Sequence, residues 1–314
     1  MSKYRTRLPQ MEGQPFLTDG GLETTLVFHE GIDLPHFAAF PLLQDEAGAR
    51  LLRRYFQTYV AIAQRFHAGL ILEAATWRAS PDWGALLGYS PSSLAEVNRA
   101  AIRLLEEIRE EAQLSQPAVI SGCVGPRGDG YVPSAAMTIG EAATFHWPQI
   151  VTFAASAADM VSAITMNYTA EAIGVALAAE AARMPVAISF TVETDGRLPT
   201  GQPLGEAIQE VDDATAGYPS YFMINCAHPE HFEPALGQGA WTGRIRGLRA
   251  NASRLSHAEL NEATELDAGD PGELGASYAG LLRGPLPNLT VLGGCCGTDH
   301  RHIESIADAC VRRS

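Results

Sequence analysis

The stretch PVAISFTV, residues 185–192, is nearly continuous in apolar and small residues and shows no regular alternation of polar and apolar positions. Such a run is typical of a parallel β-strand that is buried on both faces, because a solvent-exposed face would place polar residues at every second position. A helix-like segment follows the run further along the chain. This strand-then-helix unit indicates a parallel α/β protein.

The same unit recurs along the 314 residues. Seven more runs have strand character: 16–21, 70–77, 118–125, 159–166, 221–226, 246–253 and 289–297. Eight alternations without an obvious linker predict a single (β/α)₈ TIM barrel over residues 1–314, with residues 1–15 as a flexible tail. A doubly wound open sheet is the alternative, but no Gly-x-Gly-x-x-Gly follows the first run to support it.

Helix signals lie between the strand runs. Ser93 with Glu96, and Thr138 with Glu141, have the spacing of a capping box ahead of apolar-periodic segments. Residues 171–183 and 300–313 have the composition of two further helices.

Charge and composition exclude several classes of function. The formal net charge of −14 argues against a nucleic acid or an anionic membrane as partner. No apolar stretch reaches the ~18 residues of a membrane span, and no apolar signal region follows the N-terminus, so we expect a cytoplasmic protein. Five cysteines do not form a disulfide framework, which predicts free thiols. Lys3 is the only lysine, and its place in the N-terminal segment argues against Schiff-base chemistry.

The active site of a TIM barrel lies at the C-terminal ends of its strands, where this chain carries many reactive side chains. Those ends hold Asp19, Glu73, Cys123, Thr165, Glu193, Cys226, Asn251, Cys295 and Cys296. The candidate substrate-binding residues are Asp19, Gly20, Gly21, Glu73, Trp77, Thr165, Glu193 and Asn251.

Three of the cysteines fall at the ends of the sixth and eighth strand runs, which lie near each other in a closed barrel. Thiolates are ligands that zinc prefers, and catalytic zinc sites commonly use three protein ligands and one open position. Cys226, Cys295 and Cys296 are therefore candidate ligands. Glycines beside the adjacent pair would let both side chains face one metal ion.

Other interpretations of the same residues remain open. Cys295 and Cys296 could form a vicinal disulfide, or the surrounding GGCCG loop could bind phosphate, although it lacks the ending of a phosphate-binding loop. His228 could ligate metal or form a structural hydrogen bond at the head of the following helix. Cys310 has the setting of a buried cysteine without a ligand role, and Cys123 has no obvious partner.

Several motifs together resemble the homocysteine S-methyltransferases, a family of zinc-dependent thiol methyltransferases. LTDGGLETTL, SGCVGP, FHWPQI and the block beginning PVAISFTVETDG resemble its sequence blocks, and INCAHPEHF and GGCCGTDHRHI resemble its two zinc-ligand motifs. The resemblance extends over nearly the whole chain. It implies a (β/α)₈ barrel with zinc on Cys226, Cys295 and Cys296, a thiol acceptor such as homocysteine, and methionine as product.

One position departs from the family pattern. Ile164 stands where the family has a glutamate that binds the amino group of homocysteine. Glu73, Glu193 or Glu23 could replace that carboxylate, or the acceptor could be another thiol, since a buried ammonium without a counter-charge is costly.

The methyl donor is not fixed by the sequence. A small onium compound of the sulfonium or betaine type is the simplest donor, and Trp77, Trp147 and Tyr131 are candidates to stack on its charge. A zinc hydrolase and a non-enzymatic zinc- or thiol-sensing barrel are the competing functions, and nothing in the sequence sets the oligomeric state.

Overall fold

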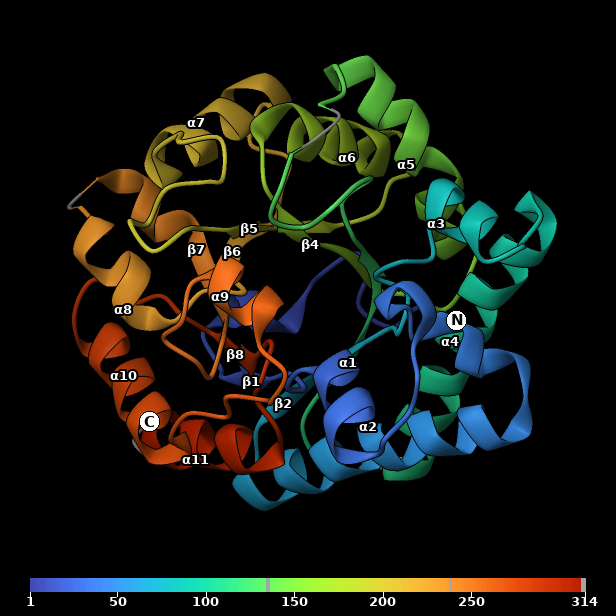
Figure 1. Cartoon of the computed structure of the whole chain (residues 1–314), viewed down its shortest axis with the longest axis horizontal. Coiled ribbons are helices and arrows are strands. Elements are labelled where there is room, and N and C mark those ends of the chain that lie inside the picture. The colour runs from blue at the N-terminus through green and yellow to red at the C-terminus, as the bar shows by residue number, and fades with distance from the viewer. Residues whose placement is uncertain (134–135, 238, 312–314) are drawn as a thin grey trace.

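Eight parallel strands close into a barrel in the order β1 to β8, with β8 hydrogen-bonded to β1 (Figure 1). This computed structural model describes residues 1–133, 136–237 and 239–311. The strands are β1 (Phe16–Leu17), β2 (Gly69–Glu73), β3 (Ala118–Val124), β4 (Met160–Met166), β5 (Val186–Thr191), β6 (Tyr221–Asn225), β7 (Ile245–Ala250) and β8 (Val291–Gly294). Each strand lies within a predicted run, or in the case of β2 and β7 begins one residue earlier, which confirms the TIM barrel.

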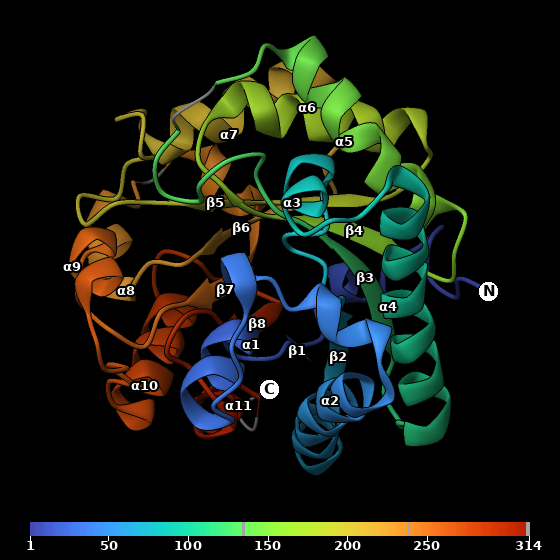
Figure 2. The same cartoon turned by 45° about the vertical axis from the view of Figure 1, so that its right-hand side comes forward.

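Helices surround the sheet and connect consecutive strands (Figure 2). They are α1 (Leu22–Thr24), α2 (Glu46–Phe66), α3 (Pro81–Leu86), α4 (Pro91–Ala112), α5 (Ile139–Ala154), α6 (Thr169–Ala181), α7 (Leu204–Thr215), α8 (Pro229–Phe232), α9 (His257–Glu262), α10 (Pro271–Arg283) and α11 (His300–Cys310). Among the described residues, no helix is both long enough and apolar enough to cross a bilayer.

One of the two predicted capping boxes is confirmed and the other is wrong. Thr138 and Glu141 form the predicted capping box at the start of α5. Ser93 is not a cap, because α4 begins earlier, with Ser90 as N-cap and Pro91 in the first turn. Proline fits the first helical position because the missing N–H would have no partner there, so Pro91 moves the helix start three residues upstream.

The strands are buried along their length, as continuous apolar runs require. A large apolar cluster packs the outer face of the barrel against the helices. A smaller cluster fills the barrel interior with residues such as Phe16, Met160 and Tyr221 from different strands. The barrel interior is therefore a packed core.

Residues 1–15, expected to form a flexible tail, instead make contacts beneath the barrel. The carboxylate of Asp159, just before β4, accepts hydrogen bonds from the backbone N–H groups of Lys3 and Tyr4. Leu8 is buried in the interior cluster, and the Gln10 side chain reaches Tyr221 on β6. The expectation of a flexible tail does not fit these contacts, because an apolar side chain enclosed by the barrel is held in place.

Candidate functional site

A cavity of about 440 Å³ opens at the C-terminal ends of the strands. Its walls come from the ends of β1, β2, β3, β4, β6, β7 and β8 and from the loops that follow them. The segment after β7 contributes Leu260 and Leu266 to its lining, and Figure 1 shows α9 lying across the barrel opening. The cavity is thus placed where a TIM barrel binds its substrate.

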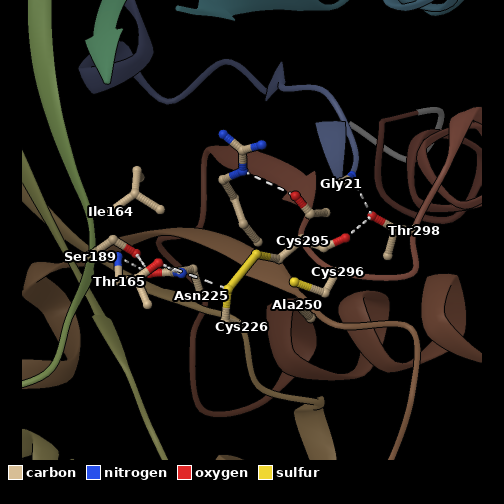
Figure 3. The surroundings of a disulfide bond; sticks show 12 residues. Gly21, Ile164, Thr165, Ser189, Asn225, Cys226, Ala250, Cys295, Cys296 and Thr298 are labelled. Atoms are coloured by element: carbon tan, nitrogen blue, oxygen red, sulfur yellow. Dashed lines mark hydrogen bonds between the residues drawn. A yellow bond between two sulfur atoms is a disulfide. The ribbon is translucent and has the colours of Figure 1, made fainter. Parts of the chain in front are cut away.

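Three cysteines meet at one wall of this cavity. The Sγ atoms of Cys226, Cys295 and Cys296 all lie within 4.8 Å of one another. Figure 3 shows Cys226 and Cys295 joined by a disulfide, with the sulfur of Cys296 beside them. The barrel brings this pair together across 69 residues of sequence. Once reduced, this donor set fits a soft metal ion such as zinc, because it offers three sulfurs and no competing ligand type.

The backbone around Cys295 is held tightly. Its N–H donates to the carbonyl of Ala250, and its carbonyl accepts from the hydroxyl of Thr298. A Cβ at Gly21 would lie 2.6 Å from the Cys295 carbonyl oxygen, so only glycine permits this approach of the segment after β1 to the segment after β8. Gly297 has φ +78°, a left-handed conformation that glycine adopts without strain. These constraints turn the adjacent cysteines toward the cavity.

Asn225 links the ends of β4, β5 and β6. Its Oδ1 accepts from the N–H of Thr165 at 3.0 Å and from the hydroxyl of Ser189, and its Nδ2 donates to the Thr165 hydroxyl at 2.9 Å (Figure 3). Thr165 and Cys226 both have positive φ, of 67° and 54°. Such backbone strain persists only where the surroundings enforce it, and Asn225 supplies that restraint.

Tyr131 and His257 contact the cysteines. The Tyr131 hydroxyl lies 3.8 Å from Cys296 Sγ, and the Tyr131 ring contacts that of His257 in a tilted arrangement with centroids 4.0 Å apart. His257 contacts the carbonyl of Cys226 through Nε2 and the carboxylate of Glu193 through Nδ1. The loops after β3 and β7 therefore reach the cysteines together.

A buried ionic network lies deeper in the cavity. The Arg249 guanidinium is 2.7 Å from Asp19 and 3.5 Å from Glu73. Burial alone would lower the pKa of Arg249, but the two carboxylates outweigh it and the pKa is raised. Burial raises the pKa of Asp19 and raises that of Glu73 to about 7, although Arg249 opposes both shifts. The Oε1 atom of Glu73 is buried and has no hydrogen-bond partner among the described residues.

Two further side chains, one apolar and one acidic, line the cavity. Ile164 lines it and is 7% exposed, so an apolar surface stands beside the cysteines at the end of β4 (Figure 3). Glu23, from α1, also lines it, and burial raises the pKa of its carboxyl to about 7.

Comparison with known proteins identifies the family. The homocysteine S-methyltransferase family matches residues 16–310. The chain belongs to this family. It is therefore an enzyme of the methyltransferase class. The zinc hydrolase and sensor interpretations lose their basis, since they require a chain outside that class.

Solved structures share the fold of this chain, and one relative is similar to part of it. The oxidised form of the homocysteine methyltransferase MmuM from Escherichia coli is 21% identical, with a TM-score of 0.74 and 96% of both chains covered. Its metallated form is also 21% identical, with a TM-score of 0.72 and coverage of 96% of this chain and 98% of that one. Methionine synthase from Mycobacterium leprae is 29% identical over 140 residues, 41% of this chain and only 10% of the relative.

Most candidate substrate-binding residues of the methyltransferase line the cavity: Asp19, Gly20, Gly21, Glu73, Trp77 and Thr165. Glu193 and Asn251 are not among the lining residues. Tyr131 lines the cavity, whereas Trp147 is 41% exposed on α5 and stands outside it. His228 is the N-cap of α8 and accepts from the N–H of Glu230, as the structural interpretation predicted.

Four side chains around the methyltransferase site were not predicted from the sequence: Arg78, Asn225, Arg249 and His257. Arg249 and Asn225 lie within strand runs, and their position near the C-terminal end was the available signal. No local pattern marks His257, because its partners come from distant parts of the chain.

Proposed function

We propose that this methyltransferase transfers a methyl group from a small onium donor to the thiol of homocysteine, giving methionine, with zinc held by Cys226, Cys295 and Cys296. The observation that carries the proposal is the meeting of these three sulfurs within 4.8 Å at the mouth of this family's barrel. Zinc bound there would supply the positive charge that keeps a thiol deprotonated at neutral pH.

The chain's own residues would place the two substrates. In the transfer, the acceptor sulfur forms a bond to the methyl carbon, and the bond from that carbon to the donor breaks with its electron pair. The acceptor proton is released to solvent. A cationic donor fits a cavity whose lining includes the aromatic rings of Tyr131 and Phe28 and the carboxyl group of Glu23.

Glu73 is the best candidate to bind the acceptor's amino group in place of the missing strand-four glutamate. It lines the cavity, and its free Oε1 leaves one oxygen without a partner. Glu193 stands outside the lining, where it pairs with His257. A buried carboxylate oxygen gains most from a charged donor, which an α-ammonium group provides.

The test of the function is direct. The reduced, zinc-loaded protein is incubated with homocysteine and, in turn, S-methylmethionine, S-adenosylmethionine, a sulfonium osmolyte and glycine betaine. We expect methionine to form with at least one donor and only when zinc is present. No methylated thiol from any pair would contradict the proposal.

A second candidate is transfer to a thiol without an α-amino group, which the apolar Ile164 favours. Comparison of kcat/KM for homocysteine and 4-mercaptobutanoate, its desamino analogue, separates the two acceptors. We expect the wild type to prefer homocysteine and Glu73→Gln to lose roughly ten- to a hundredfold of that preference, the range of a lost charged hydrogen bond.

Ile164→Glu in the Glu73→Gln background should restore the preference, and Ile164→Leu should not. A wild type that is indifferent to the amino group would instead establish the second candidate.

A further inference from the structure

Arg78 is a charged residue enclosed by aromatic rings in the wall of the cavity. It follows Trp77 beyond the end of β2, lines the cavity and is only 9% exposed. Its guanidinium carbon lies 4.3 Å from the ring centroid of Trp77 and 3.9 Å from that of Trp83. Two aromatic rings therefore lie close to the guanidinium.

The hydrogen-bonding capacity of this guanidinium is not filled. Nη1 donates to the carbonyl of Gly128 at 2.9 Å, whereas Nε is buried and has no partner. Among the described residues, no carboxylate forms an ion pair with Arg78, in contrast to Arg249, which is paired with both Asp19 and Glu73. Burial lowers the pKa of Arg78, and Asp129 and Glu23 offset that effect only in part.

A buried cation without a counter-ion is costly, and a planar guanidinium with open donors matches a carboxylate. The position also suits a ligand of the cysteine site. The loop after β3 contacts Arg78 through Gly128 and Cys296 through Tyr131, so the guanidinium and the cysteines belong to one cavity.

We propose that Arg78 binds the carboxylate of an amino-acid substrate in the cavity, which also holds the acidic groups that would receive the ammonium group of that substrate. The inference rests on the proposed function, because it names the class of compound that the same site selects. The carboxylate belongs either to the thiol acceptor or to an onium donor of the amino-acid type. Arg78 and Glu73 together would then recognise both charges of one zwitterion.

Two pairs of compounds distinguish these sources. Homocysteine is compared with 3-mercaptopropylamine, which lacks only the carboxylate. S-Methylmethionine is compared with (3-aminopropyl)dimethylsulfonium, its counterpart without the carboxylate. Each compound is titrated calorimetrically into the reduced, zinc-loaded wild type and Arg78→Gln, and kcat/KM is measured wherever methyl transfer occurs.

We expect Arg78→Gln to weaken binding of one carboxylated compound roughly ten- to a hundredfold and binding of its counterpart less than threefold. The affected pair identifies the source. Arg78→Lys should lose about tenfold, because an ammonium keeps the charge but not the paired donors. Arg65→Gln is the matched control, since that guanidinium also lies over a ring, Phe66, but pairs with Glu304 on the surface. Arg65→Gln should leave the affinity for all four compounds unchanged.

Equal losses for both members of each pair would assign Arg78 to holding the loop through Gly128 and would overturn the proposal, as would no loss at all. If circular dichroism shows that Arg78→Gln does not fold, Arg78→Lys carries the same comparison. Absence of methyl transfer by the wild type would refute the proposed function alone, because the titrations read carboxylate binding without turnover.

Discussion

At the scale of single residues, this site depends on side chains whose partners are set by the barrel and not by their neighbours in sequence. Cys226 meets Cys295 across 69 residues, and Arg249 meets Asp19 across 230. The cysteines were predictable because their type, spacing and position at strand ends all agree. Arg78 was not, because its distinguishing property is a missing partner, which a sequence does not display.

The assignment of the three cysteines as zinc ligands can be tested without measuring methyl transfer. After reduction, the wild type should bind one zinc ion per chain, and Cys226→Ser, Cys295→Ser and Cys296→Ser should each lose most of it, because a hydroxyl is a far weaker zinc ligand than a thiolate. Metal analysis after dialysis provides the measurement. Cys310→Ser, at the end of α11, is the control and should retain zinc. Full retention by Cys296→Ser would defeat the ligand assignment.

The raised pKa of Glu73 predicts how the stability of the protein depends on pH. Its folded pKa of about 7 exceeds the 4.5 of an exposed glutamate, so the folded state binds more protons between these values. The free energy of unfolding should therefore fall as the pH rises from 4.5 to 7. Arg249 and Asp19 face the same carboxyl.

Glu73→Gln should reduce the fall in the free energy of unfolding between pH 4.5 and 7 by on the order of 3 kcal/mol. Urea unfolding at several pH values measures this change. Glu46→Gln, an exposed change on α2, should leave the slope as it is. An unchanged slope in Glu73→Gln would show that this carboxyl titrates normally.

At the scale of elements, the strand runs were predictable and the loops were not. A parallel strand buried on both faces must be apolar along its length, so all eight runs were visible in the sequence. The start of α4 was mistaken because two serines compete for the cap, and Pro91 decides between them. The contact of Tyr131 with His257 joins two loops of different strands, and no periodicity records such a contact.

Asn225 provides the test at this scale, because it acts on strand ends and not on a ligand. Asn225→Ala would leave the buried N–H of Thr165 without its acceptor, which costs about 1–3 kcal/mol of unfolding free energy. The zinc affinity should fall as well, since Cys226 follows directly. Denaturant titration and a chelator competition measure the two effects. Asn288→Ala, at an exposed position, should alter neither value, and an Asn225→Ala protein that matches it would exclude this positioning role.

At the scale of the whole molecule, the barrel is open at one end and closed at the other by residues 1–12. Leu8 is 6% exposed and belongs to the interior cluster. Below it, Asp159 also pairs with Arg109, so the segment is attached to a rigid ionic anchor. This closure was not predictable, because the segment is mostly polar and only two of residues 1–12, Leu8 and Gln10, are buried.

Leu8→Ala should lower the free energy of unfolding by about 2–5 kcal/mol, the range for a buried leucine whose site cannot collapse. Zinc binding at the opposite end should persist. Leu86→Ala, at a position 63% exposed on α3, should change stability by less than about 0.5 kcal/mol. Equal stability of the two variants would mean that the closure contributes nothing.

The closure also has a consequence for synthesis on the ribosome. The hydrogen bonds from Lys3 and Tyr4 to Asp159 can form only after Asp159 is translated, more than 150 residues later. The contact of Gln10 with Tyr221 needs a residue that is translated 211 residues later. This segment therefore contacts residues that are translated much later than itself. Until β4 and β6 have been translated, Leu8 therefore lacks part of the interior cluster that buries it in the folded barrel.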